Sequence, residues 1–155
     1  MSRRRKEAAG VRLLGRVRRF FPAVQSVQDA LQDEVVEVTA KDVARSAKGN
    51  HNACALARAC ERELKADAAI IAVSRAFLVY GERAIRYRLT ERAQREIVSF
   101  DRGAAFMPGK YVLVAPSNGN RMGSTRDRTK DKKKTRRRRA YRLTQGIRAG
   151  MQRAT

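Results

Sequence analysis

Apolar positions in the first part of the chain recur at the spacing of an α-helix. Within residues 3–20 they fall on one side, at Val11, Leu13, Leu14, Val17 and Phe20, while arginines occupy the other side. Pro22 ends this helix or begins the next turn, and the same spacing continues through residues 23–32, at Val24, Val27 and Leu31. We therefore expect a helical segment, which is either a helix docked on its own domain or a basic helix that recognises a partner.

Residues 34–64 predict a strand followed by two helices. The run at 35–38 is rich in β-branched residues, and Thr39 with Asp42 three positions later resembles a capping box. Gly49 and Asn50 end the short helix that follows. The next helix, within residues 52–64, has its inward positions at Ala55, Leu56, Ala59, Cys60 and Leu64.

Residues 68–115 predict most of a sheet. Apolar residues in 68–89 alternate with a period of two, with breaks at Ser74 and Gly81, so two or three antiparallel strands are expected. Thr90 caps a third helix, Gly103 stands where a C-terminal glycine cap belongs, and residues 110–115 form a last strand.

The predicted order β-α-α-β-β-α-β describes a small α+β domain, with an antiparallel sheet and two or three helices. Six apolar side chains should be buried in it: Leu56, Ile70, Val79, Leu89, Ile97 and Phe100.

Charge divides the chain into three parts. The 155 residues carry 36 Lys and Arg against 15 Asp and Glu, a net charge of +21. Residues 1–20 hold eight basic residues and one acidic residue, and residues 121–155 hold fourteen basic and two acidic residues, whereas the rest of the chain is nearly neutral. We therefore predict a compact domain at 34–115 between a basic helical arm at 1–33 and a basic arm at 116–155, which ends in a short helix.

Blocks of like charge are typical of segments that bind a polyanion, and arginine suits phosphate because its guanidinium binds in a fork. We predict that the following residues bind the polyanion: Arg3, Arg4, Arg5, Lys6, Arg12, Arg16, Arg18, Arg19, Arg128, Lys130, Lys132, Lys133, Lys134, Arg136, Arg137, Arg138, Arg139 and Arg142. The alternative for the C-terminal arm is a solvated tail. The apolar residues of its last helix should dock on a partner: Tyr141, Leu143 and Ile147.

The expected partners are acidic protein surfaces, such as capsid subunits, and the phosphates of nucleic acid. A membrane is the weakest candidate, since no apolar run approaches the roughly 18 residues that a spanning helix needs. Few aromatic residues accompany the basic ones, so stacking on single-stranded bases should not dominate.

Catalytic or metal chemistry has little support in the sequence. His51, the one histidine, lies near Cys54 and Cys60, but no third group is placed to orient a Cys–His pair, and a zinc site needs four ligands. The spacing of a phosphate-binding loop is absent. We expect no catalytic residue, no metal and no cofactor.

The central domain resembles a family of small, largely uncharacterised proteins of tailed bacteriophages. The resemblance lies in "VEVTAKDVARSAKGNHNACALARAC", "YRLTERAQREIVSFDRG" and "FMPGKYVL", and covers residues 35–114. The chain departs from the family in having Ala55 after Cys54, and in having Thr90, where proline is common. The basic arms are not part of the family pattern.

The resemblance implies an origin and a fold, and no reaction. It favours a non-enzymatic structural protein of a phage-type particle, with a minor capsid or capsid-cementing role in a multi-copy assembly. The domain would dock on the shell, and the arms would clamp acidic neighbours or genome. The alternative is a free nucleic-acid-binding accessory protein of the infected cell. The expected location is the virion, or the host cytoplasm during assembly.

Overall fold

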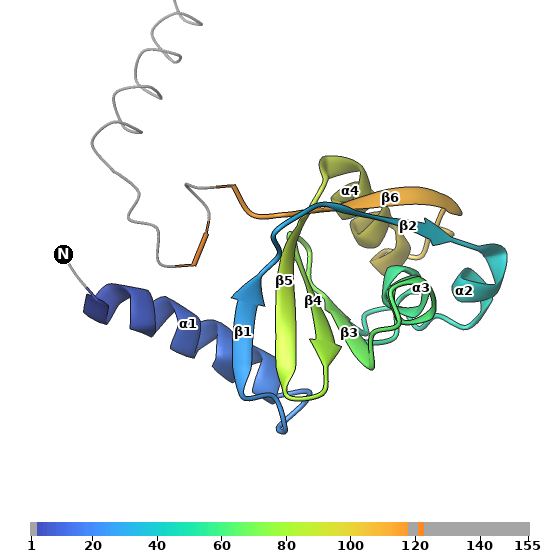
Figure 1. The fold of residues 1–155 in the computed structure, drawn as a ribbon. Coiled ribbons are helices and arrows are strands. Elements are labelled where there is room, and N and C mark those ends of the chain that lie inside the picture. Colours follow the sequence, from blue (N-terminus) through green and yellow to red (C-terminus); the bar gives the residue numbers. More distant parts are fainter. Residues whose placement is uncertain (1–2, 118–120, 123–155) are drawn as a thin grey trace, which may run out of the picture. The chain divides into compact units, whose positions relative to one another are not determined.

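The computed structural model describes residues 3–117 and 121–122, and for residues 3–10 it describes the helical backbone alone. It confirms the α+β class (Figure 1). The elements follow in this order: α1 (Arg3–Arg18), β1 (Ser26–Asp29), β2 (Glu34–Val38), α2 (Ala40–Ala44), α3 (Ala55–Glu63), β3 (Ala68–Ile71), β4 (Arg75–Tyr80), β5 (Arg83–Leu89), α4 (Glu91–Asp101) and β6 (Gly109–Val114).

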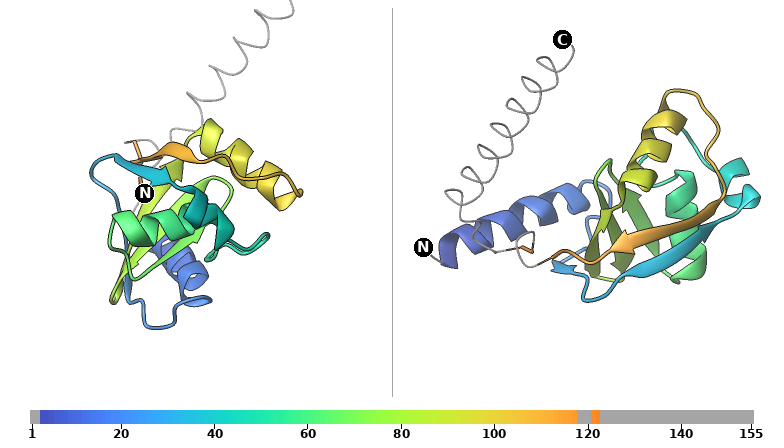
Figure 2. Two further views of the ribbon diagram at one scale, coloured as in Figure 1. Left: turned by 90° about the vertical axis from the view of Figure 1, so that its right-hand side faces the viewer. Right: turned by 90° about the horizontal axis from the view of Figure 1, so that it is seen from above.

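The six strands form one sheet in which β5 has three neighbours. The path β2-β6-β5-β4-β3 is antiparallel throughout. Along its other edge β5 first pairs with β1, in parallel, and then with the end of β6. Strands β1 and β6 therefore share one edge of β5. The sheet curls at the point where the partner of β5 changes from β1 to β6 (Figures 1 and 2).

Two predicted helix starts, one predicted helix end and one predicted turn are confirmed, because they depend on local chemistry. The predicted end of the short helix at Gly49 and Asn50 is wrong, because α2 already ends at Ala44. Thr39 and Asp42 form a complete capping box before α2, and the Thr90 side chain accepts a hydrogen bond from the Ala93 N–H at the start of α4. Gly103 ends α4 with a φ of +106°, and Gly81 turns β4 into β5 with a φ of +60°. Both glycines hold a left-handed conformation that other residues adopt only with strain.

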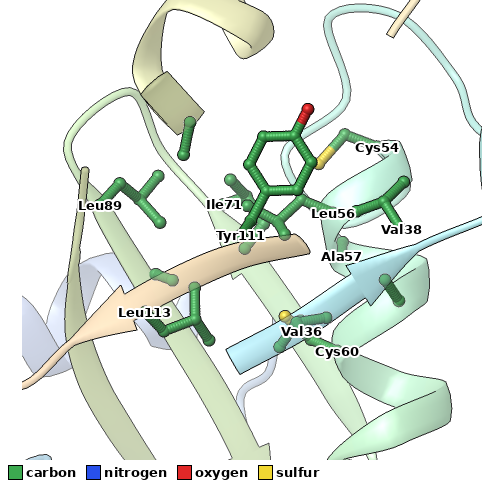
Figure 3. Close-up of a cluster of buried hydrophobic side chains, with 14 of the residues drawn as sticks. Val36, Val38, Cys54, Leu56, Ala57, Cys60, Ile71, Leu89, Tyr111 and Leu113 are labelled. Carbon is green, nitrogen blue, oxygen red and sulfur yellow. The ribbon is translucent and has the colours of Figure 1, made fainter. Parts of the chain in front are cut away.

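One face of the sheet, here called the α3 face, holds the larger hydrophobic core (Figure 3). Helices α3 and α4 cover it, and Leu56 lies among Val36, Ile71, Tyr111 and Leu113 without solvent exposure above 1%. The six side chains expected to be buried are all buried, which confirms that prediction.

Helix α1 covers the opposite face, here called the α1 face (Figure 2). Leu13 and Val17 are buried against a second cluster that includes Ile70, Phe77 and Val79. These contacts are those of a helix docked on its own domain, the first of the two alternatives. They also explain why β4 is buried along both faces rather than on alternate residues.

The prediction of a helix through residues 23–32 is wrong, because these residues include strand β1. The Gln25 N–H donates to the Glu82 carbonyl and the Ala30 N–H to the Arg86 carbonyl, so the backbone is satisfied by β5. Val24 is buried in the second cluster, whereas Leu31 is 88% exposed. The helical spacing of these apolar residues was coincidental.

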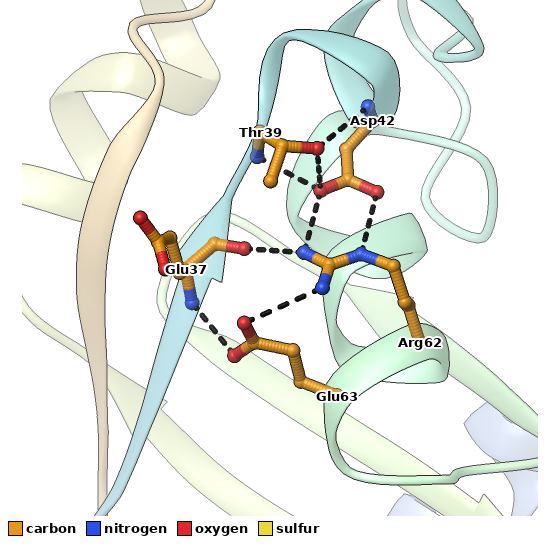
Figure 4. Close-up of polar contacts among 5 residues, drawn as sticks. All are labelled: Glu37, Thr39, Asp42, Arg62 and Glu63. Carbon is orange, nitrogen blue, oxygen red and sulfur yellow. Dashed lines mark hydrogen bonds and ion pairs between the residues drawn. The ribbon is translucent and has the colours of Figure 1, made fainter.

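The outer edge of β2 is fastened by side chains of α3 (Figure 4). The Glu37 N–H donates to Glu63 Oε2 over 2.8 Å, and the Arg62 guanidinium donates to the Glu37 carbonyl over 2.7 Å. The same guanidinium donates to both carboxylate oxygens of Asp42, over 3.3 and 2.9 Å. Because Asp42 also caps α2, this network joins β2, α2 and α3, and it occupies backbone groups of an edge strand.

Candidate polyanion interface

Helix α1 presents exposed arginines outside the apolar stripe that packs on the sheet. Arg12 and Arg16 are exposed and one helical turn apart, and Arg19, also exposed, follows at the end of the helix. Burial of Leu13 and Val17 against the sheet fixes the orientation of the helix. The basic residues at positions 3–6 lie in the first turns of α1, where only the backbone is described.

Arg18 is used differently from its neighbours. Its Nε donates to the Val24 carbonyl over 2.7 Å, and a terminal nitrogen donates to Gln25 Oε1 over 3.0 Å. These bonds hold the turn that connects α1 to β1. The structure therefore gives Arg18, one of the predicted polyanion-binding residues, a role in positioning the helix.

The predicted C-terminal contacts lie outside the described residues. They comprise the polyanion-binding residues Arg128, Lys130, Lys132, Lys133, Lys134, Arg136, Arg137, Arg138, Arg139 and Arg142, and the docking residues Tyr141, Leu143 and Ile147.

The structure adds a group of arginines that sequence reasoning missed, on the α1 face of β4 and β5. The Cα of Arg75 is paired with that of Arg88, and Phe77 is paired with Arg86. Because paired residues share a face and residues two apart on a strand also share one, Arg75, Arg86 and Arg88 stand on the same face. Two like charges directly opposite each other destabilise a sheet.

Arg86 has a carboxylate partner. It is buried, and its Nε lies 2.6 Å from Asp29 Oδ1 on β1, with side-chain exposures of 9% and 13%. The other oxygen, Asp29 Oδ2, accepts the Met122 N–H over 2.6 Å. Both oxygens of this carboxylate are therefore already engaged.

Arg75 lies in a positive field. Partial burial lowers the pKa of its guanidinium, and the charges of Arg86 and then Arg16 lower it further. Arg16 of α1 is thus close enough to Arg75 for the two charges to repel each other. We call Arg16, Arg75, Arg86 and Arg88 the arginine cluster. The sequence alone indicates that Arg86 and Arg88, two apart in a predicted strand, share one face. Their alignment with Arg75 follows only from the register between β4 and β5.

His51 lies at the surface, whereas Cys54 and Cys60 are both buried in the larger hydrophobic core. His51 is exposed, with Nδ1 3.0 Å from the Ile71 carbonyl oxygen, and its ring meets the edge of Phe20. Cys54 and Cys60 are buried free thiols, and burial raises the pKa of both. No three possible metal ligands come together within residues 3–117 and 121–122.

We predict that neither thiol reacts with iodoacetamide at neutral pH in the folded protein. The thiolate is the nucleophile, and burial both blocks access and disfavours its formation. Mass spectrometry would count the adducts, and the same protein in guanidinium chloride, where both thiols should react, is the control. Rapid stoichiometric labelling of the native protein would contradict this assignment of both cysteines to the core.

Comparisons with protein-family models, curated proteins and solved structures found no match. The resemblance to phage proteins therefore stays a prediction. In the described part of the chain, no helix combines the length and the apolar character required to cross a membrane.

Proposed function

We propose that this protein binds nucleic acid through the phosphate backbone, as a non-enzymatic structural component of a phage-type particle. The observation that supports it most directly is the exposed row of arginines on α1, a helix held to the domain by buried Leu13 and Val17. The particle setting rests on the resemblance of residues 35–114 alone.

Charge favours nucleic acid over an acidic protein surface. A net charge of +21 on 155 residues exceeds what one acidic patch can neutralise, whereas a nucleic acid offers phosphates in an extended row. Arginine binds phosphate in a bidentate manner and so suits this ligand. With only 6% aromatic residues, the chain should contact the backbone more than the bases, so binding should be largely independent of sequence.

The two basic regions have complementary roles in this proposal. Helix α1 is fixed to a folded domain, so its arginines hold the nucleic acid in one orientation. Residues 128–142 concentrate the largest run of positive charge in the sequence and supply affinity. The domain itself would contact the shell of the particle.

The test measures affinity for duplex DNA across a salt series, by fluorescence anisotropy of labelled DNA. Replacing Arg12, Arg16 and Arg19 together by Gln should weaken binding and reduce the slope of log K against log salt by as much as about 3, since each phosphate contact contributes about 0.9. Replacing Arg136, Arg137, Arg138 and Arg139 by Gln in the full chain should reduce it by up to about 4.

The matched control removes the same charge from another surface. Lys41→Gln, Arg45→Gln and Arg95→Gln together change three exposed residues, in α2, at its C-cap and in α4, and should leave the slope nearly unchanged. Wild-type protein that fails to bind DNA, or that binds polyglutamate more tightly than DNA, would overturn the proposal. Co-sedimentation with intact particles supports the particle setting, and its absence favours a free accessory protein.

A further inference from the structure

We propose that the α1 face of the sheet contains a fixed site for one phosphodiester group, formed by Arg75 and Arg88. The inference deepens the proposed function and rests on it for the source of the phosphate. It differs in placing a contact on the folded sheet, outside both basic arms.

The geometry brings two guanidinium groups together from neighbouring strands. Arg75 and Arg88 are direct cross-strand partners, so their side chains leave the same face from positions about 5 Å apart. Long side chains that start so close can reach one anion from two sides. An opposite charge at either position would stabilise the sheet, whereas two arginines weaken it. A phosphate bound between them removes the repulsion.

The surrounding charges do not neutralise this pair. Asp29, a carboxylate on this face, is engaged by Arg86 and by the Met122 N–H. No ion pair joins Arg16, Arg75 or Arg88 to an acidic side chain in the described ranges. The arginine cluster thus has four guanidinium groups and one carboxylate. Partial burial, and after it the charges of Arg86 and Arg16, lower the pKa of Arg75.

A phosphodiester fits this environment better than a carboxylate side chain. It spreads one negative charge over two oxygens that can accept from separate guanidinium groups. Partial burial of Arg75 reduces the screening of that charge by solvent. Arg16 belongs both to the exposed row of α1 and to the cluster, so a backbone lying along α1 would bring a further phosphate to the sheet.

The experiment compares full-length wild type with the double variant Arg75→Gln and Arg88→Gln. The control is Arg83→Gln, an exposed arginine of the same strand on the α3 face. Thermal unfolding is followed in sodium chloride and in sodium phosphate at equal ionic strength, and duplex DNA binding is followed across a salt series. The unfolding measurements in phosphate probe the site directly, and the DNA-binding measurements identify the source of the phosphate.

In chloride, the double variant should melt about 1 to 5 °C above wild type, because the repulsion between opposed arginines is gone. Phosphate should raise the melting temperature of wild type and of Arg83→Gln, and this increment should be lost in the double variant. The DNA salt slope of the double variant should fall by about 1, as expected for one phosphate contact.

Two outcomes would overturn the inference. If phosphate stabilises all three proteins equally, there is no site at this pair. If the phosphate increment depends on Arg75 and Arg88 but the DNA affinity and slope do not, the site takes a phosphate from another source. Failure of the proposed function would give a different result. Wild type would then not bind DNA at any salt concentration, whereas phosphate could still stabilise it through Arg75 and Arg88.

Discussion

Leu56→Ala should destabilise the protein by about 2 to 5 kcal/mol, the largest effect we expect from a single substitution. Leu56 is fully buried in the first turn of α3, among residues of β2, β3 and β6 (Figure 3). Its removal leaves a cavity between the helix and the sheet that these neighbours fill only in part. Urea denaturation should show a lower midpoint with an unchanged m-value.

The control for this substitution is Leu31→Ala. Leu31 is 88% exposed between β1 and β2, so its truncation removes almost no buried surface and should change stability by less than about 0.5 kcal/mol. Equal midpoints for Leu56→Ala and wild type would show that α3 does not pack on the sheet as described.

Asp42→Ala should destabilise the protein by about 1 to 3 kcal/mol at neutral pH, because it removes a capping box and the carboxylate that Arg62 binds (Figure 4). Burial raises the pKa of Asp42, but the hydrogen bonds from Arg62 and Thr39, with the charge of Arg62, outweigh it, so the net pKa is lowered. This stabilisation is therefore complete above the pKa of the unfolded carboxyl, near about 4, and is lost as pH falls through the lower folded value.

The difference in unfolding free energy between wild type and Asp42→Ala should accordingly be constant near neutral pH and shrink in acid. Denaturation at a series of pH values measures it. Asp42→Asn, which keeps an acceptor but loses the charge, should fall between the two. Glu91→Gln is the control, since that side chain is 86% exposed and should have little effect. A wild-type advantage that persists undiminished at the lowest pH would contradict the assigned role of the charge.

The sequence by itself determined the features whose causes lie within a few residues. Thr39 and Thr90 cap helices because a hydroxyl can accept from an N–H one turn ahead, and Gly81 and Gly103 reverse or end elements because they tolerate positive φ. The α+β class followed from these signals, together with the apolar runs between them. The charges on α1 were likewise visible, because helical spacing alone separates its arginines from Leu13 and Val17.

The tertiary structure alone decided the features that depend on pairing between distant segments. Residues 26–29 became a strand because β5 offered an open edge and Arg86 a partner for Asp29, although their spacing suited a helix equally well. The candidate phosphate site has the same origin. Arg75 and Arg88 are thirteen positions apart, and only the antiparallel register of β4 and β5 places them opposite each other. A one-residue shift of that register would put them on opposite faces, since successive side chains of a strand alternate.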